Sequence, residues 1–194
     1  GVWLVPIGPL TNIALALRAA PDLGSRIAGI SLMGGGTFGN VSAAAEFNLW
    51  ADPEAADIVF RYGGKLMMSG LDVTHQFQAT PDRLTAIRAI PGQLPNVLAD
   101  LLAFYSKSYI NHHVNMTGAA VHDPCAVLSL THPQFFTITP HRVDIELRGE
   151  HTRGMTMIDR RQYKTPTTPN CDVVWNVDAA PAFDVLIEAV NHFA

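Results

Sequence analysis

The sequence is poor in cysteine, in charge and in basic residues, and each shortage excludes a class of protein. Its 194 residues include only two cysteines, Cys125 and Cys171. Two cysteines cannot build the disulfide framework of a small secreted domain, and we expect a reducing, cytoplasmic location. Lys+Arg number 13 against 17 Asp+Glu, which gives a formal net charge of -4. Since no basic cluster offsets that balance, nucleic acid is not an expected partner.

Long apolar runs are also missing. No run approaches the roughly 18 residues that a membrane span requires, and the first residues lack the charged-then-apolar pattern of a signal peptide. We therefore expect no membrane association. The hydrophobic fraction of 48% and the charged fraction of 15% are typical of a globular protein. The length suits one domain over residues 1–194.

Apolar runs alternate with helical patterns along the first third of the chain. The runs predict buried strands, and the stretches between them have helical spacing: strands at 2–6, 27–33 and 65–69, helices at 10–20 and 52–62. Thr11 or Asn12 is expected to cap the first helix, and Asp52, followed by Pro53, the second. This alternation predicts an α/β fold, a mostly parallel open sheet with flanking helices and a Rossmann-like core.

The rest of the chain is more helical and ends in further strands. Helices are predicted at 81–90, 94–112, 124–130 and 179–193; two antiparallel strands at 142–147 and 155–158; and another strand at 172–177. Internal repeats, low-complexity segments and linkers are not found. The pattern is therefore interpreted as one α/β unit.

The stretch from Met33 to Asn48 carries the strongest functional signal. An apolar strand ends at three glycines, and a polar loop with Asn40, Glu46 and Asn48 follows. In an open α/β sheet, ligands bind outside the carboxyl ends of the strands. Glycines let the backbone approach a ligand, and amides and a carboxylate suit a polyhydroxylated small molecule. The simpler interpretations are a solvated carboxylate at Glu46 and a core side chain at Met33.

A second signal is the sequence His122-Asp123-Pro124. With Pro124 at the first helical position, Asp123 is a natural N-cap, which is the simpler interpretation. Alternatively, Asp123 is a carboxylate ligand for a hard cation and His122 is a proton donor. Histidine titrates near neutrality and so can protonate a leaving group at physiological pH.

Other side chains have weaker signals. Tyr105 and Tyr109 are four residues apart on one helix and share a face, either for packing or as an aromatic wall for a flat heterocycle. Cys125 lies in an apolar helical turn and is interpreted as inert packing. His112 and His113 have no partner at metal-ligand spacing and are interpreted as surface residues.

Taken in order, six short motifs resemble the inosine–uridine-preferring nucleoside hydrolase family over essentially the whole chain. Each motif is weak by itself, and the ordered set is specific. The motifs are Gly8-Pro9-Leu10-Thr11-Asn12-Ile13-Ala14, Leu32-Met33-Gly34-Gly35-Gly36, Ala45-Glu46-Phe47-Asn48, Asp52-Pro53-Glu54-Ala55-Ala56, Gly70-Leu71-Asp72-Val73-Thr74-His75 and Val121-His122-Asp123-Pro124-Cys125-Ala126.

The resemblance implies hydrolysis of the N-glycosidic bond of a ribonucleoside to ribose and free base, assisted by calcium, in a homo-oligomer. Purine and pyrimidine nucleosides both remain open as substrates. Asp123 and the backbone carbonyl of Ile7 would be calcium ligands, and His122 would be the general acid. The remaining substrate-binding residues would be Met33, Asn40, Glu46, Phe47 and Asn48 around the ribose, and Tyr105 and Tyr109 around the base.

The sequence departs from the family pattern at its start. The family has an N-terminal Asp-x-Asp followed by Asp-Asp, which supplies most of the calcium carboxylates and the general base, and nothing here matches it. We therefore expect the C-terminal portion of a nucleoside hydrolase, without the N-terminal strands, with an exposed apolar sheet edge and with weak or no activity by itself. The alternatives are a catalytically inactive module that binds ribose or a nucleoside, and a truncated remnant.

Overall fold

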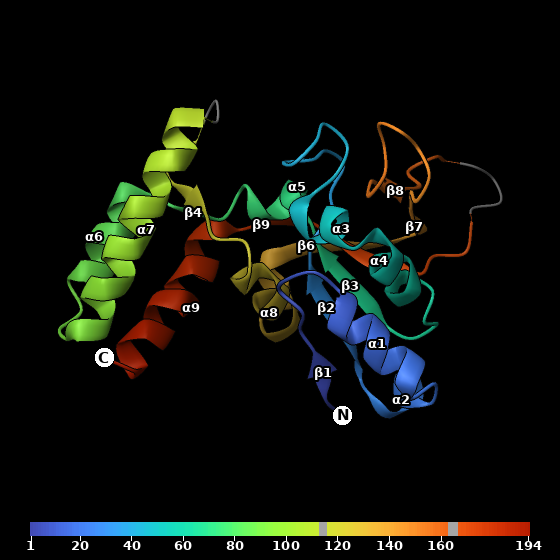
Figure 1. The fold of residues 1–194 in the computed structure, drawn as a ribbon. Helices are drawn as coiled ribbons and strands as arrows, with labels where there is room; N and C mark the ends of the chain where they lie inside the picture. The colour runs from blue at the N-terminus through green and yellow to red at the C-terminus, as the bar shows by residue number, and fades with distance from the viewer. Residues whose placement is uncertain (113–115, 163–166) are drawn as a thin grey trace.

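A five-stranded sheet forms the centre of the fold in the computed structural model, which describes residues 1–112, 116–162 and 167–194 (Figure 1). The first four strands of the sheet pair in parallel, and the last pairs antiparallel to its neighbour. The predicted mostly parallel open sheet is therefore confirmed. The strands, in their order across the sheet, are β1 (Trp3–Leu4), β2 (Gly29–Met33), β3 (Leu66–Ser69), β9 (Cys171–Val177) and β6 (Phe136–His141).

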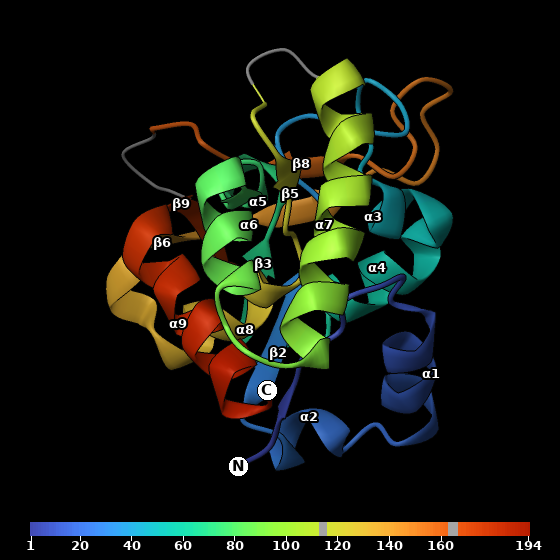
Figure 2. The ribbon, with the colours of Figure 1, turned by 90° about the vertical axis from the view of Figure 1, so that its left-hand side faces the viewer.

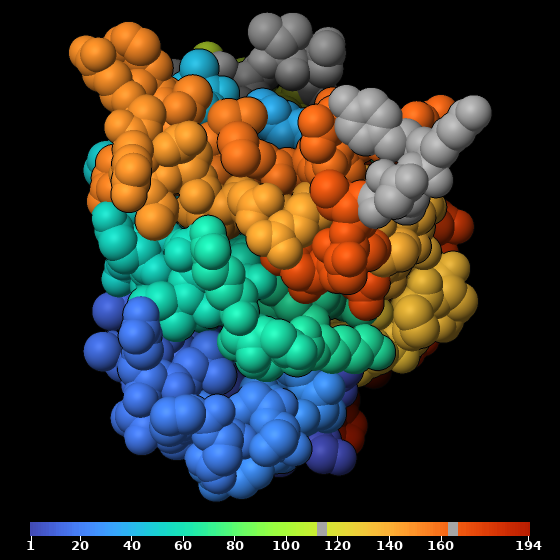
Figure 3. Space-filling model, turned by 90° about the vertical axis from the view of Figure 1, so that its right-hand side faces the viewer, coloured from blue at the N-terminus to red at the C-terminus, as the bar shows by residue number. Residues whose placement is uncertain are grey.

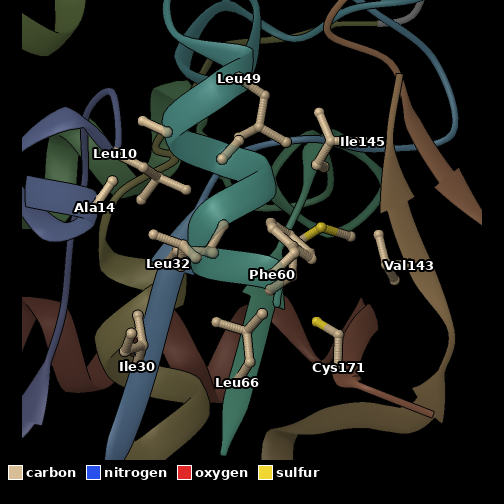
Figure 4. Close-up of a cluster of buried hydrophobic side chains, with 14 of the residues drawn as sticks. Leu10, Ala14, Ile30, Leu32, Leu49, Phe60, Leu66, Val143, Ile145 and Cys171 are labelled. Atoms are coloured by element: carbon tan, nitrogen blue, oxygen red, sulfur yellow. The ribbon is translucent and has the colours of Figure 1, made fainter. Parts of the chain in front are cut away.

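Helices cover both faces of this sheet, which explains why β2 and β3 are buried along their length. Every residue of both strands is buried, as a parallel sheet between two helical layers requires. On one face, α4 lies over β2 and β3, where Phe60 packs with Leu32 and Leu66 in the main core (Figure 4). This layer comprises α1 (Thr11–Ala19) and α4 (Pro53–Phe60), with α2 (Leu23–Arg26) beside α1.

The opposite face is covered by α8 (Pro124–Thr131), which contacts β2 and β3. The hydroxyl of Ser31 in β2 donates to the carbonyl of Ala126 at 2.7 Å, so a buried polar group ties this helix to the sheet. The segment that contains His122 and Asp123 immediately precedes α8. The packing of α8 therefore sets the position of both residues relative to the ends of the strands.

A second core lies among the three helices beside the sheet, α6 (Pro81–Arg88), α7 (Gln93–His112) and α9 (Ala179–His192) (Figure 2). Phe77 and Phe183 pack at its centre with ring centroids 5.1 Å apart. Arg83 lies over the ring of Phe183 and donates to the backbone carbonyls of Gln78 and Ala179. Ala99 of α7 belongs to the same core, so the helix that carries the two tyrosines packs against these elements. None of the helices in the described residues is long and apolar enough to cross a membrane.

Two smaller sheets complete the fold. The strands β7 (Val143–Ile145) and β8 (Thr156–Ile158) pair antiparallel, as predicted. Figure 3 shows this hairpin in orange above the green residues that follow α4 and the blue residues of α1 and α2. The short strands β4 (Gln78–Ala79) and β5 (Ala119–Ala120) also pair antiparallel and link α5 (Leu71–Thr74) to the segment before α8.

Several short elements were not predicted. The strand β6 contains Pro140, which is tolerated because β6 lies at the edge of the sheet. A short 3-10 helix (Pro133–Phe135) precedes it. Two short helices, α3 (Phe47–Ala51) and α5 (Leu71–Thr74), occupy stretches that were interpreted as polar loop and turn. Each is about one turn long, too short for helical periodicity to be visible in the sequence.

Some predicted boundaries and caps were also wrong. The first strand covers only Trp3–Leu4 instead of residues 2–6, and the helix expected at 52–62 ends at Phe60. Leu10 occupies the N-cap position of α1, so neither Thr11 nor Asn12 is the cap. The hydroxyl of Thr11 instead donates to Asp52 Oδ2 at 2.5 Å.

Asp52 is the predicted cap that the structure confirms, and its removal has a measurable consequence. Its Oδ1 accepts from the backbone N–H of Ala55 at 3.0 Å. We expect Asp52→Ala to lower the free energy of unfolding by about 1 kcal/mol, because the first turn of α4 loses this acceptor. Asp178→Ala is the matched control, since Asp178 is the N-cap residue of α9 but makes no capping hydrogen bond. Urea unfolding of both variants checks this, and equal losses would contradict it.

Candidate active site

All ten site residues predicted from the sequence line one cavity of about 370 Å³. The cavity lies at the carboxyl ends of the parallel strands, beyond Met33 at the end of β2 and near the segment that follows β1. The structure brings these residues together from four separate segments of the chain, although it does not assign their roles. The lining residues are Ile7, Met33, Asn40, Glu46, Phe47, Asn48, Tyr105, Tyr109, His122 and Asp123, together with Val41, which was not predicted.

Glu46 is a buried carboxylate and the N-cap of α3. It is only 3% exposed. Its carboxylate accepts from the backbone N–H groups of Gly35 and Asn48, both at 2.9 Å, and of Leu49 at 3.3 Å. Burial raises the pKa of Glu46, although these hydrogen bonds act in the opposite direction. The interpretation of Glu46 as a solvated loop carboxylate was therefore wrong, because the glycine turn and the start of α3 both direct N–H groups at it.

Two asparagines line the same cavity as this carboxylate, and in each of them one atom of the side-chain amide hydrogen-bonds to the backbone. Asn48 Nδ2 donates to the carbonyl of Met33 at 3.1 Å, and Asn40 Oδ1 accepts from the N–H of Phe47 at 2.9 Å. Within the described part of the chain, no hydrogen bond occupies Asn48 Oδ1 or Asn40 Nδ2. One acceptor and one donor are therefore available to a ligand in the cavity.

Met33 and Phe47 form apolar parts of the wall. Met33 is 3% exposed and packs against Leu71 and Ala126, so it is a core residue that also reaches the cavity. Its sulfur accepts from Asn48 Nδ2 at 3.4 Å. Phe47 is half exposed and lies at the rim, with its ring 6.5 Å from that of Trp50. The core interpretation of Met33 is therefore confirmed, and its contact with a ligand stays a prediction.

The glycine turn is held in place by two side chains that sequence reasoning did not single out. Gly35 and Gly36 have φ angles of 72° and 149°, which favour glycine. Thr156 Oγ1 accepts from the N–H of Gly36 at 2.9 Å, and Asp72 accepts from the N–H and the hydroxyl of Thr37 at 2.8 and 2.6 Å. Asp72 belongs to a quoted motif, whereas Thr156 had no visible signal because its partner is distant in sequence.

His122 lies between two hydroxyl groups. Its Nδ1 is 2.7 Å from Thr74 Oγ1, and its Nε2 is 2.6 Å from Tyr109 Oη. The Tyr105 hydroxyl donates to Tyr109 Oη at 3.4 Å, and the two rings contact edge to face. Burial raises the pKa of Tyr109 well above its usual range. The two tyrosines therefore share a face, as predicted, and that face lines the cavity beside the imidazole.

Asp123 occupies the N-cap position of α8 without capping it. Its φ and ψ of -65° and -39° are helical, and its side chain makes no capping hydrogen bond. The simpler interpretation of Asp123 as a helix cap was therefore wrong. The residue is exposed at the cavity, and desolvation by its surroundings raises the pKa of the carboxyl group.

The donors at this end of the cavity suit calcium by type but not by number. Asp123 offers a carboxylate, and Ile7 offers a backbone carbonyl beside a side chain that is 51% exposed. Calcium takes six to eight oxygen ligands. In the residues that the structure describes, no group of three or more His, Cys, Asp or Glu side chains could hold a metal ion. These residues alone therefore do not complete a calcium shell.

Further rings lie beside His122. The ring of His75, which belongs to the Gly70–His75 motif, is 5.7 Å from that of His122 and 6.4 Å from that of Tyr109. Cys125, one turn into α8, is fully buried, and burial raises the pKa of its thiol to about 12, which confirms it as inert packing. His113 and the side chain of His112 lie outside the described residues.

An open, mostly parallel sheet with a cavity of about 370 Å³ at the carboxyl ends of its strands, lined by a histidine and two carboxylates, defines an α/β protein with a candidate small-molecule site. A family comparison makes the class specific. The model of the inosine-uridine preferring nucleoside hydrolase family matches residues 1–184. The chain belongs to this family.

Relatives and solved structures support the same assignment. The chain is 44% identical over 194 residues to the pyrimidine-specific ribonucleoside hydrolase RihA of Shewanella woodyi, and 40% identical to that of Escherichia coli; the match covers all of this chain and 62% of each relative. The structure of a purine-preferring ribonucleoside hydrolase from Gardnerella vaginalis superposes with a TM-score of 0.88 at 36% identity, covering 99% of this chain and 62% of that one. The chain therefore spans somewhat less than two thirds of the length of the proteins that it matches.

Proposed function

We propose that this protein hydrolyses the N-glycosidic bond of ribonucleosides to ribose and free base. One observation carries the proposal. The Glu46–Asn48 corner and the His122–Asp123 corner are far apart in sequence, yet they line the same cavity. A nucleoside has a polyhydroxylated sugar at one end and a flat heterocycle at the other, and the cavity offers groups suited to each.

The sugar would bind at the Glu46 corner. Asn48 Oδ1 and Asn40 Nδ2 are oriented by their other amide atoms and can accept from and donate to sugar hydroxyls. Glycoside cleavage passes through an oxocarbenium-like sugar. The buried carboxylate of Glu46 favours positive charge nearby, and the backbone N–H groups that it accepts from hold it in place.

The base would lie against Tyr105 and Tyr109, with His122 as the general acid. A leaving base needs a proton, and the imidazole lines the same cavity as the sugar-facing residues. The tyrosine rings offer an aromatic surface with hydroxyl groups.

Calcium is part of the proposal. Asp123 and the Ile7 carbonyl would hold the ion, and the other oxygens would come from substrate, water and protein groups beyond the described residues. When bound, calcium would hold the sugar diol and lower the pKa of a coordinated water.

Calorimetric titration of calcium, with and without ribose, tests this function together with an assay of base release from uridine and inosine. We expect calcium binding that ribose strengthens, and we expect Asp123→Asn to weaken calcium binding by at least about tenfold, because a neutral amide replaces the carboxylate ligand. Asp22→Asn, an exposed change at the residue before α2 and outside the cavity lining, is the control. If Asp123→Asn and Asp22→Asn bind calcium equally well, Asp123 is not a ligand.

A module that binds ribose or a nucleoside without hydrolysis is the second candidate. The amide atoms of Asn40 and Asn48 that are available in the described part of the chain favour it, since neither needs a metal ion to bind a sugar hydroxyl. Saturable ribose binding with neither calcium binding nor base release would support the module and exclude the hydrolase. Homo-oligomerisation and a cytoplasmic location stay predictions.

A further inference from the structure

We propose that Thr74 is the positioning residue that orients His122 so that its proton is presented from Nε2 toward the cavity. This inference rests on the proposed function, in which His122 protonates the leaving base. The observation behind it is the 2.7 Å contact between Thr74 Oγ1 and His122 Nδ1, on the side of the ring opposite Tyr109. Neither residue type nor spacing in the sequence indicates this contact.

The backbone of Thr74 is fixed by the turns that follow β2 and β3. Thr74 ends α5, which starts after Gly70, and its N–H donates to the carbonyl of Gly70 at 3.1 Å. The N–H of Leu71 donates to the carbonyl of Gly35 at 2.9 Å, so α5 is tied directly to the glycine turn that follows β2. Thr74 is fully buried, and a β-branched side chain has few χ1 rotamers available. The hydroxyl is therefore held in one place relative to the cavity.

The hydroxyl proton of Thr74 decides which nitrogen of neutral His122 is protonated. Among the described residues, His122 Nδ1 is the one hydrogen-bond partner of Thr74 Oγ1. A buried O–H without an acceptor is costly, so the hydroxyl donates to Nδ1. Nδ1 is then the unprotonated nitrogen, and the ring proton is on Nε2.

The same hydroxyl also suits the charged ring. When the imidazole gains a second proton, the Thr74 hydroxyl rotates and accepts from Nδ1–H, because a hydroxyl can both donate and accept. Nε2 carries a proton in both states. Nε2 lies 2.6 Å from Tyr109 Oη, and Tyr109 lines the cavity. The charged ring gives its Nε2 proton to the departing base, which leaves a neutral imidazole with its one proton on Nδ1, where the Thr74 hydroxyl accepts the hydrogen bond.

Nitrogen-15 NMR of the histidine rings in the full 194-residue chain tests the orientation without requiring activity. His122 is assigned with a His122→Gln variant and observed at a pH where the ring is neutral. We expect Nε2 to be protonated and Nδ1 to show the upfield shift of a nitrogen that accepts a hydrogen bond. In Thr74→Val, which keeps the shape and removes the hydroxyl, Nδ1 should shift downfield. Thr74→Ser should restore the wild-type position.

Two NMR results would overturn the inference: a proton on Nδ1 of neutral His122 in the wild-type chain, or an Nδ1 resonance that does not move in Thr74→Val. If Thr74→Val does not fold, the spectra of the wild-type protein and of Thr74→Ser still test the inference, because they show which nitrogen of His122 is protonated when the hydroxyl is present.

A kinetic comparison separates positioning from a merely structural role. A riboside with a nitrophenolate leaving group needs no proton from the enzyme, unlike uridine or inosine. Thr74→Val should lower kcat for uridine and inosine by about tenfold, with little change in KM. This loss is smaller than the about hundred- to ten-thousandfold that a general acid contributes, because His122 itself is still present. The nitrophenyl riboside should be hydrolysed at nearly the wild-type rate. Equal losses on both kinds of substrate would overturn the inference.

The failure of this inference is distinguishable from failure of the proposed function. If His122→Ala does not discriminate between the two kinds of substrate, His122 is not the acid and the proposed mechanism fails. If His122→Ala discriminates and Thr74→Val does not, only the positioning role of Thr74 is wrong.

Discussion

Replacing His122 with alanine is expected to reduce base release from uridine and inosine by about a hundred- to ten-thousandfold, the usual range for loss of a general acid. His122 lines the cavity, and the hydroxyl groups of Tyr109 and Thr74 contact its two ring nitrogens and orient the ring. Without the imidazole, the departing base leaves as an anion. The measurement is kcat in a preparation that hydrolyses these nucleosides.

The choice of substrate sharpens this test. Hydrolysis of a nitrophenyl riboside should be nearly unaffected in His122→Ala, because that leaving group departs without protonation. His192→Ala is a matched control, since His192 is exposed at the end of α9, away from the cavity. A His122→Ala enzyme that keeps wild-type kcat on uridine and inosine would exclude the assigned role.

Replacing Glu46 with alanine is expected to lower the free energy of unfolding by about 3 kcal/mol, because three backbone N–H groups lose their acceptor in a buried site. Those donors come from the glycine turn and from the first turn of α3, so the loss also loosens the sugar-facing corner. Urea unfolding measures the change. Glu188→Ala, an exposed carboxylate on α9, is the control and should change stability little.

The pH dependence of Glu46→Gln gives a second reading of the same site. Burial raises the pKa of Glu46 in the folded protein above the ordinary value of 4.5. Because the pKa of Glu46 is higher in the folded than in the unfolded protein, the contribution of Glu46 to the free energy of unfolding is fully present below pH 4.5. This contribution declines as the pH rises through the pKa of the folded state. Glutamine does not ionise, so the stability difference between wild type and Glu46→Gln should shrink over that rise in pH. A difference that grows with pH would mean that hydrogen bonding outweighs burial at this carboxylate.

The fold was predictable where local pattern is strong. The mostly apolar runs of β2 and β3 and the capped start of α4 can be identified from neighbours in sequence alone, because burial on both sheet faces and helix capping depend on short-range residue order. The strand β6 was missed because its pairing partner, β9, lies far along the chain. The helices α3 and α5 were missed because each is a single turn defined by contacts to the glycine turn.

For the candidate site, the sequence by itself determined which residues to examine and which family they indicate, since ordered short motifs carry that information. Only the tertiary structure decided the state of each group. Glu46 is buried, Asp123 does not cap its helix, and His122 is held between Thr74 and Tyr109. The physical reason is that burial and hydrogen-bond geometry depend on how β2, β3, α7 and α8 pack, and that packing joins residues that are far apart in the chain.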